Sequence, residues 1–146
     1  MKPFVVTRQI NAPQELVFET VSNAIEFSKI LPHSLSVEFL TEHQTGLGAR
    51  FKETRQMGKQ QHVTELEVTE YDSPNRVRML NEDPVADWDT TYTLTEKDGG
   101  TELKVVMECT PKKLIPGIFI RLFWGKVDKA MQADFDLVKA DLESRS

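Results

Sequence analysis

The sequence has few residues of the kinds that build disulfide or metal sites. Among its 146 residues there is one cysteine, Cys109, and there are three histidines. A single cysteine excludes an intrachain disulfide framework. His33, His43 and His62 lie in separate predicted elements and lack the spacing of metal ligands. We therefore expect no metal, no cofactor and the reducing environment of the cytoplasm.

Long apolar runs and basic clusters are also missing. No stretch approaches the roughly 20 apolar residues that a membrane span needs, and residues 1–6 do not resemble a secretory signal. The net charge is −5, without the basic stripe that phosphate binding requires. No phosphate-binding glycine loop, nucleophile elbow or zinc-helix motif occurs. The sequence predicts a soluble cytoplasmic protein with no nucleic-acid partner and no stable membrane insertion.

The most informative pattern is a long apolar stripe near the C-terminus. From Leu114 to Leu142, apolar residues recur every three or four positions, which predicts a helix with one continuous apolar face. Pro116 and Gly117 disfavour a helix interior, so we expect the regular helix to begin at Ile118. It would run for about 25 residues, roughly 38 Å.

The chain before this helix has mainly the period of β-strands. Residues 4–10 alternate between apolar and polar, and two short helices are predicted between residues 13 and 32. From residue 37 to 109, six alternating segments are separated by short turns, which indicates an antiparallel meander. Without a linker or a repeat, residues 1–146 should form one domain.

The widths of these elements imply a hollow. A helix about 10 Å wide cannot cover six strands spaced about 4.8 Å apart unless the sheet curves around it. The residues predicted to face inward change from aliphatic to polar and aromatic along the strands. An inward polar group costs about 1–3 kcal/mol if it is unpaired, so water or a ligand should fill the space.

Five short motifs occur in order along the chain. They are INAP at 10–13 followed by VF at 17–18, GLGARF at 46–51, EVTEYDSP at 67–74, GTEL at 100–103 and LVKADLE at 137–143. Together with the order of elements, they resemble the polyketide cyclase/dehydrase-type branch of the START-like superfamily, also called SRPBCC or birch-pollen-allergen-like. The resemblance covers almost the whole chain. It implies an α+β helix-grip fold, with a curved antiparallel sheet of about seven strands around a long C-terminal helix and two short helices after the first strand.

For function, the resemblance implies the binding of sterols, lipids, hormones or polyketides, the cyclisation of polyketides, or a co-chaperone role. Its motifs belong to the scaffold, so no catalytic residue carries over. Catalytic residues are therefore unknown, and three inward polar residues are weak candidates. Glu53 and Arg55 could hold a polar ligand group or act as an acid–base pair, but a mutual ion pair explains them as well. His62 could act as a general base, although no carboxylate that would orient it is recognisable in the sequence.

Trp88 and Tyr92 are the best candidates for ligand contact, because each combines a large apolar surface with one hydrogen-bonding tip. Asn81 and Thr90 would orient a ligand by hydrogen bonds, or would otherwise bind water. Ordinary core packing is the alternative for the aromatic residues. The full predicted set of ligand-binding residues is Phe51, Arg55, His62, Met79, Asn81, Trp88, Thr90, Tyr92, Met107, Phe119, Phe123 and Val127.

These observations leave three hypotheses open. The first is binding of a hydrophobic or amphipathic small molecule, such as a lipid, a sterol or a polyketide-like compound, in a cavity between sheet and helix. The second is a polyketide cyclase/dehydrase-type enzyme in the same cavity, with His62 or Glu53 as the acid–base group. The third is a protein-partner module that uses the outer sheet face or residues 114–124. That segment could be a cavity mouth or a membrane-touching patch, and its length suits a gate better than an anchor. A homodimer is also left open.

Overall fold

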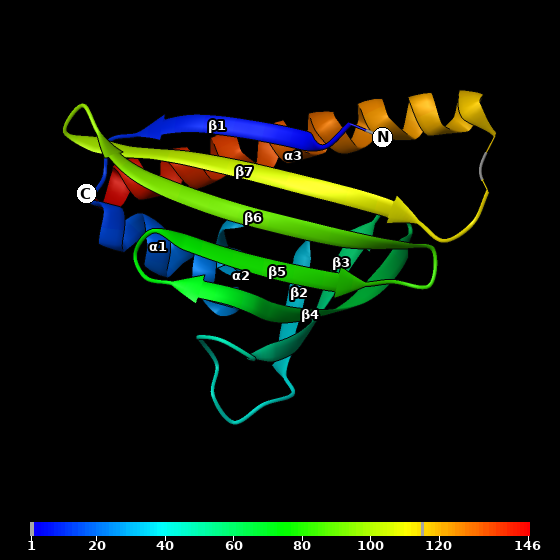
Figure 1. The fold of residues 1–146 in the computed structure, drawn as a ribbon, viewed down its shortest axis with the longest axis horizontal. Coiled ribbons are helices and arrows are strands. Elements are labelled where there is room, and N and C mark those ends of the chain that lie inside the picture. The colour runs from blue at the N-terminus through cyan, green and yellow to red at the C-terminus, as the bar shows by residue number, and fades with distance from the viewer. Residues whose placement is uncertain (1, 115) are drawn as a thin grey trace.

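The computed structural model describes residues 2–114 and 116–146, which form an α+β arrangement of one sheet and three helices (Figure 1). The strands and helices fall where the hydrophobic periods predicted them, with small shifts at their ends. In chain order they are β1 (Phe4–Ile10), α1 (Gln14–Ser22), α2 (Ala24–Ile30), β2 (Ser34–Phe39), β3 (Arg50–Met57), β4 (Gln60–Asp72), β5 (Arg76–Glu82), β6 (Ala86–Lys97), β7 (Gly100–Pro111) and α3 (Gly117–Arg145).

The seven strands form one antiparallel sheet in the order β1-β7-β6-β5-β4-β3-β2. Strands β2 to β7 are the predicted meander, and β1 returns to pair with β7, with Phe4 opposite Met107 and Ile10 opposite Thr101. Gly100 lies at the start of β7, where an added Cβ would come within 2.4 Å of the Ile10 carbonyl oxygen. Only glycine therefore allows this close approach of the β6–β7 hairpin to β1.

The sheet curves, and the helices lie on its concave side (Figure 1). Register shifts between Val68 and Glu70 of β4 and between Ser34 and Ser36 of β2 contribute to this curvature, because an extra residue in one strand bends it. The core is densest where α1 and the end of α3 cover the sheet. Its fully buried members there include Ile10, Val17, Phe18, Leu103 and Leu142.

Helix α3 is 29 residues long, starts one residue before the predicted position and is divided into two unlike parts. Its buried residues are Met131, Phe135, Val138 and Leu142, all in the second half. The first turns extend past the N-terminal start of β1 at one end of the molecule (Figure 1). The apolar stripe of the sequence is therefore buried in the later turns, whereas Ile118, Phe119 and Leu122 of the first turns are exposed. None of the described helices is long and apolar enough to cross a membrane.

Candidate functional site

A chain of hydrogen bonds on the concave face centres on Glu53 of β3. Arg55 Nε donates to Glu53 Oε1 at 2.7 Å, and Ser34 Oγ of β2 donates to Glu53 Oε2 at 3.2 Å. The Ser34 hydroxyl is in turn 2.6 Å from that of Ser28 in α2. Glu53 is 8% exposed, and both of its carboxylate oxygens have partners. The ion pair that the sequence suggested is thus present, and it leaves Glu53 poorly suited to act as a free base.

Two further titratable groups, Asp134 of α3 and Tyr92 of β6, lie within electrostatic reach of this pair. Burial raises the pKa of Asp134, although the positive charges of Arg55 and His33 act in the opposite direction. Burial also raises the pKa of Tyr92 to about 12. The Tyr92 ring packs between Phe27 and Phe135, with centroid distances of 6.4 Å and 6.2 Å.

Asp134 and His33 were absent from the sequence-based set. Asp134 had a usable signal, because it is three residues after Met131 and four before Val138, and side chains at these spacings share one side of a helix. A carboxylate in the middle of a buried stripe indicates a polar interior. His33 follows Pro32 in a short connection, where periodicity gives no orientation for its side chain.

His62 of β4 lies directly opposite Arg55 in the strand register and has an acidic partner. Its Nε2 is 2.7 Å from Asp83 Oδ2, so the expectation that His62 lacks a carboxylate was wrong. Asp83 lies in the β5–β6 connection, and the residue is buried. Burial alone would raise the pKa of Asp83. The hydrogen bond from the Val85 N–H (2.8 Å), the contact with His62 and the charge of Lys112 outweigh it, so the pKa is lowered.

An ionised Asp83 can only accept hydrogen bonds, so the bond requires a proton on Nε2 of His62. The His62 side chain is 46% exposed, whereas that of Asp83 is 7% exposed. The pair therefore presents an oriented imidazole toward solvent. Glu53 belongs to a separate set of hydrogen bonds, with Arg55 and Ser34.

Asn81 of β5 has a buried polar atom without a partner. Its cross-strand neighbours are Leu66 on one side and Trp88 on the other. The Asn81 Oδ1 atom is buried and accepts no hydrogen bond within the described part of the chain. The Asp87 Oδ1 atom is also buried and also has no partner with hydrogen-bond geometry among the described residues. The Lys112 ammonium group lies 3.0 Å from it, however, and balances its charge. Among the buried side-chain atoms of residues 2–114 and 116–146, the Asn81 Oδ1 atom thus stays an uncompensated acceptor, which a donor from water or a ligand would satisfy.

The other predicted ligand-contact residues are buried to different degrees. Phe51, Met79 and Tyr92 are buried, whereas Trp88, Thr90, Met107 and Val127 are half-buried. Thr90 lies opposite both Met79 and Met107. The half-buried sheet residues on this inward side show that α3 leaves part of the concave face accessible.

The two phenylalanines proposed from α3 differ in position. Phe123 is 44% exposed, and its ring centroid is 6.1 Å from that of Trp88, so it reaches the edge of the concave face. Phe119 is 60% exposed and has no aromatic contact within the described residues. Contact between these side chains and a ligand stays a prediction.

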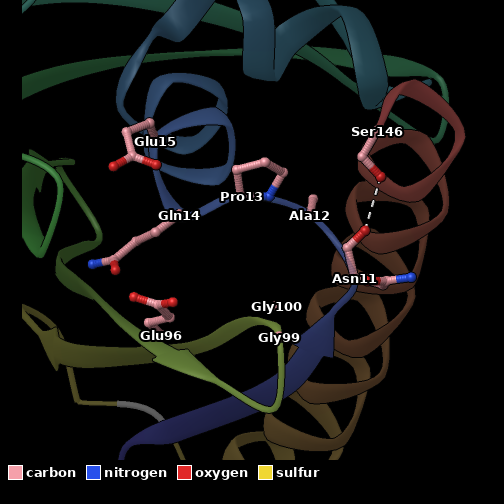
Figure 2. A pocket seen from close by; sticks show the side chains of 9 residues that line it. All are labelled: Asn11, Ala12, Pro13, Gln14, Glu15, Glu96, Gly99, Gly100 and Ser146. Carbon is pink, nitrogen blue, oxygen red and sulfur yellow. Dashed lines mark hydrogen bonds between the residues drawn. The ribbon is translucent and has the colours of Figure 1, made fainter.

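A hollow of about 650 Å³ lies at the other end of the molecule, where β1 leads into α1 and β6 turns into β7. Figure 2 shows Gln14, Glu15 and Glu96 gathered on one side of it. On the opposite side, Ser146 Oγ donates to the Asn11 carbonyl oxygen at 2.8 Å. None of the predicted ligand-binding residues lines this hollow. Within the described residues, no group of three or more histidine, cysteine or acidic side chains is placed to hold a metal ion.

Residues 1–143 match the family model described as polyketide cyclase / dehydrase and lipid transport. The chain belongs to this family. The match covers nearly the whole sequence, in agreement with the START-like resemblance of the motifs. No curated protein sequence gives a significant match.

Solved structures agree on the fold of this family member. A START superfamily protein from Mycobacterium smegmatis superposes with a TM-score of 0.79 at 12% identity, over 100% of both chains. Ara h 8.0201 gives 0.77 at 17% identity, over 97% of both chains. The di-domain ARO/CYC StfQ from the steffimycin biosynthetic pathway gives 0.80 at 12% identity, over 98% of this chain and 51% of that one. These likenesses establish the helix-grip fold.

Proposed function

We propose that this family member binds an amphipathic small molecule on the accessible part of the concave face. The ligand would have an apolar body, as in a lipid, a sterol or a polyketide-like aromatic compound, and at least one hydrogen-bond donor. The observation that carries this proposal is the Asn81 Oδ1 atom, buried without a partner between Leu66 and Trp88. A donor on the ligand would remove the free-energy cost of that acceptor.

The neighbouring side chains support the same orientation. Trp88 and Met107 are half-buried and can cover an apolar body, and methionine adapts its shape to irregular ligands. Arg55 and His62 lie opposite each other at the polar side of this region, where they can accept an anionic or hydroxylated end. Ligand sites commonly combine an apolar lining with a few fixed polar groups, as this face does.

The test uses anilinonaphthalene sulfonate, an aromatic anion that fluoresces when it leaves water. We expect saturable fluorescence with the wild-type protein, and weaker binding to the Asn81→Leu and Trp88→Phe variants. Leu47→Ser is the matched control, because Leu47 is exposed in the β2–β3 connection away from the concave face. Long-chain alcohols and hydroxylated aromatics that bind should displace the probe and raise the melting temperature by mass action. Absence of saturable binding, or equal affinity in all variants, would overturn the proposal.

A second candidate function is acid–base catalysis of the cyclase/dehydrase type on the same face. The hydrogen bond between His62 and Asp83 favours it, because a carboxylate that fixes one imidazole nitrogen leaves the other free to move a proton. Incubation with a linear poly-β-ketone should then give a product that has lost water, detected by mass spectrometry. The His62→Gln variant should lose this product even at substrate concentrations that saturate binding, so that weaker binding is not mistaken for lost catalysis. If the two proteins give equal yields, the His62–Asp83 pair has only a structural role.

A further inference from the structure

The first turns of α3 carry large apolar side chains that the protein leaves uncovered. Ile118, Phe119 and Leu122 are 70%, 60% and 62% exposed, and Leu114 just before the helix is fully exposed. The protein-facing side of the same turns is also apolar, since Trp124 and Val127 pack against the core. A helix segment with large apolar residues on both its inner and its outer side is normally covered on both, so a second surface should cover the outer side.

Positive charge surrounds this apolar patch. The chain has a net charge of −5, yet residues 112–127 contain four basic residues and no acidic one. Lys112 pairs with Asp87 at 3.0 Å. Lys113, Arg121 and Lys126 are exposed and have no ion-pair partner within residues 2–114 and 116–146. The covering surface must therefore combine an apolar interior with negative charge at its boundary.

We propose that this patch docks reversibly onto an anionic lipid surface. The docking face comprises Leu114, Ile118, Phe119, Leu122, Lys113, Arg121 and Lys126. Its apolar side chains would enter the boundary between headgroups and acyl chains, while its basic side chains contact lipid phosphates. Lys126 follows Leu122 by four residues and so lies on the same side of the helix one turn later. Along the helix, the apolar Leu122 is thus followed by the basic Lys126. A helix that enters a bilayer by its N-terminal end meets acyl chains first and headgroups further along, in the same order.

The same observations argue against a second copy of the chain as the occupant. A symmetric pair formed through this patch would bring two sets of unpaired cations together, which is unfavourable. The membrane contact is also shallow, because only about two helical turns take part. The docking face adjoins the accessible part of the concave face, since Phe123 in the following position contacts Trp88. Docking of the patch onto a lipid surface does not require that the concave face binds a ligand.

The first experiment measures flotation of the full chain with phosphatidylcholine vesicles that contain roughly one-third phosphatidylglycerol, against vesicles of phosphatidylcholine alone. We expect binding to the anionic vesicles and little to the neutral ones. The double variant Phe119→Ser/Leu122→Ser should lose at least about tenfold in partition coefficient, because the inserted apolar surface is removed. The matched control is Leu47→Ser/Val63→Ser, which replaces two equally exposed apolar residues elsewhere and should bind like the wild type.

The second experiment tests the cations. Arg121→Gln/Lys126→Gln should weaken binding about twentyfold to thirtyfold, since each basic residue near an anionic surface contributes about fivefold. Lys52→Gln/Lys104→Gln is the control of equal charge change, because both lysines are exposed on other parts of the sheet. All these sites are at the surface, so a thermal melt should show the variants folded.

Three results would overturn the proposal. The first is no binding to anionic vesicles, and the second is equal binding by Phe119→Ser/Leu122→Ser and by its control. The third is a concentration-dependent dimer that Phe119→Ser/Leu122→Ser abolishes while vesicles have no effect, which would assign the patch to a second copy. Loss of vesicle binding with retained binding of anilinonaphthalene sulfonate would support docking as a property separate from the concave-face site.

Discussion

Replacing Asn81 with leucine should make the ligand-free protein more stable. The Asn81 Oδ1 atom is buried and accepts no hydrogen bond from the described residues, and an unpaired acceptor costs about 1–3 kcal/mol. Leucine branches at Cγ as asparagine does and would lie between Leu66 and Trp88, where its methyl groups have apolar neighbours. These methyl groups are larger than the amide atoms that they replace, and the strain of fitting them offsets part of the gain. We therefore expect the free energy of unfolding to rise by about 1 kcal/mol, and by about 2 kcal/mol if repacking is good.

Urea unfolding followed by circular dichroism measures this change. With a slope of about 1–3 kcal/mol per molar urea, the midpoint should rise by roughly 0.5 M while the slope stays constant. The melting temperature should rise by roughly 3 °C per kcal/mol for a chain of this size. The same variant should lose affinity for the probe, so stability and binding change in opposite directions.

Asn75→Leu is the control for this experiment. The Asn75 Oδ1 atom accepts a hydrogen bond from Gln14 Nε2 at 3.1 Å, so this substitution removes an existing interaction and should lower stability. If Asn81→Leu is as destabilising as Asn75→Leu, the Asn81 acceptor is satisfied in solution. The argument for a ligand donor at this position would then fail.

Three further predictions concern stability and are measured by urea unfolding. Burial raises the pKa of Asp134, so its charged form destabilises the native state at neutral pH. The Asp134→Asn variant should therefore have a larger free energy of unfolding than the wild type at neutral pH. This difference should shrink as the pH falls to about 4. The pKa of Asp83 is lower in the native state than in the unfolded chain, so its stabilising effect is complete above the unfolded value and is lost as the pH falls through the native value. Between about pH 5 and pH 2, the free energy of unfolding of the wild type should therefore fall more than that of Asp83→Asn. Equal losses would contradict a lowered pKa for Asp83. Leu142→Ala should lower the free energy of unfolding by about 2–5 kcal/mol, because the Leu142 side chain is fully buried. Leu122→Ala should lower it by less than about 0.5 kcal/mol, because Leu122 is exposed. Similar losses would contradict the division of α3 into exposed first turns and buried later turns.

The fold could be predicted because local signals agreed along the chain. Alternation in residues 4–10 and 37–109 gave the strands, and short turns between them required antiparallel neighbours. The return of β1 to pair with β7 was not predicted, since nothing local to residues 4–10 specifies that partner. The exposure of Ile118, Phe119 and Leu122 appears only in the structure, because periodicity shows that a face is apolar but not what lies against it.

The candidate site was predicted less well than the fold, and the reason is sequence separation. The partner of His62 is Asp83, 21 residues later in a connection whose geometry depends on the pairing of β4 with β5. The pair of Glu53 and Arg55 was foreseeable, because both residues lie two apart on one strand face. Asn81 was identified as inward-facing, but its lack of a partner depends on three strands together and appears only in the structure.

The pairing of β1 with β7 also affects the order in which the chain can fold as it is synthesised. The first strand emerges early, yet its partner contains Met107, opposite Phe4, and is among the last segments made. The hairpins from β2 to β7 can form as they appear, whereas β1 must stay unpaired until β7 arrives. Until β1 pairs with it, the edge of β7 is open to pairing with another chain, a known route to aggregation. Because α3 is tied to β1 by the Arg8–Asp136 ion pair at 2.8 Å, the last helix should dock only after this closure.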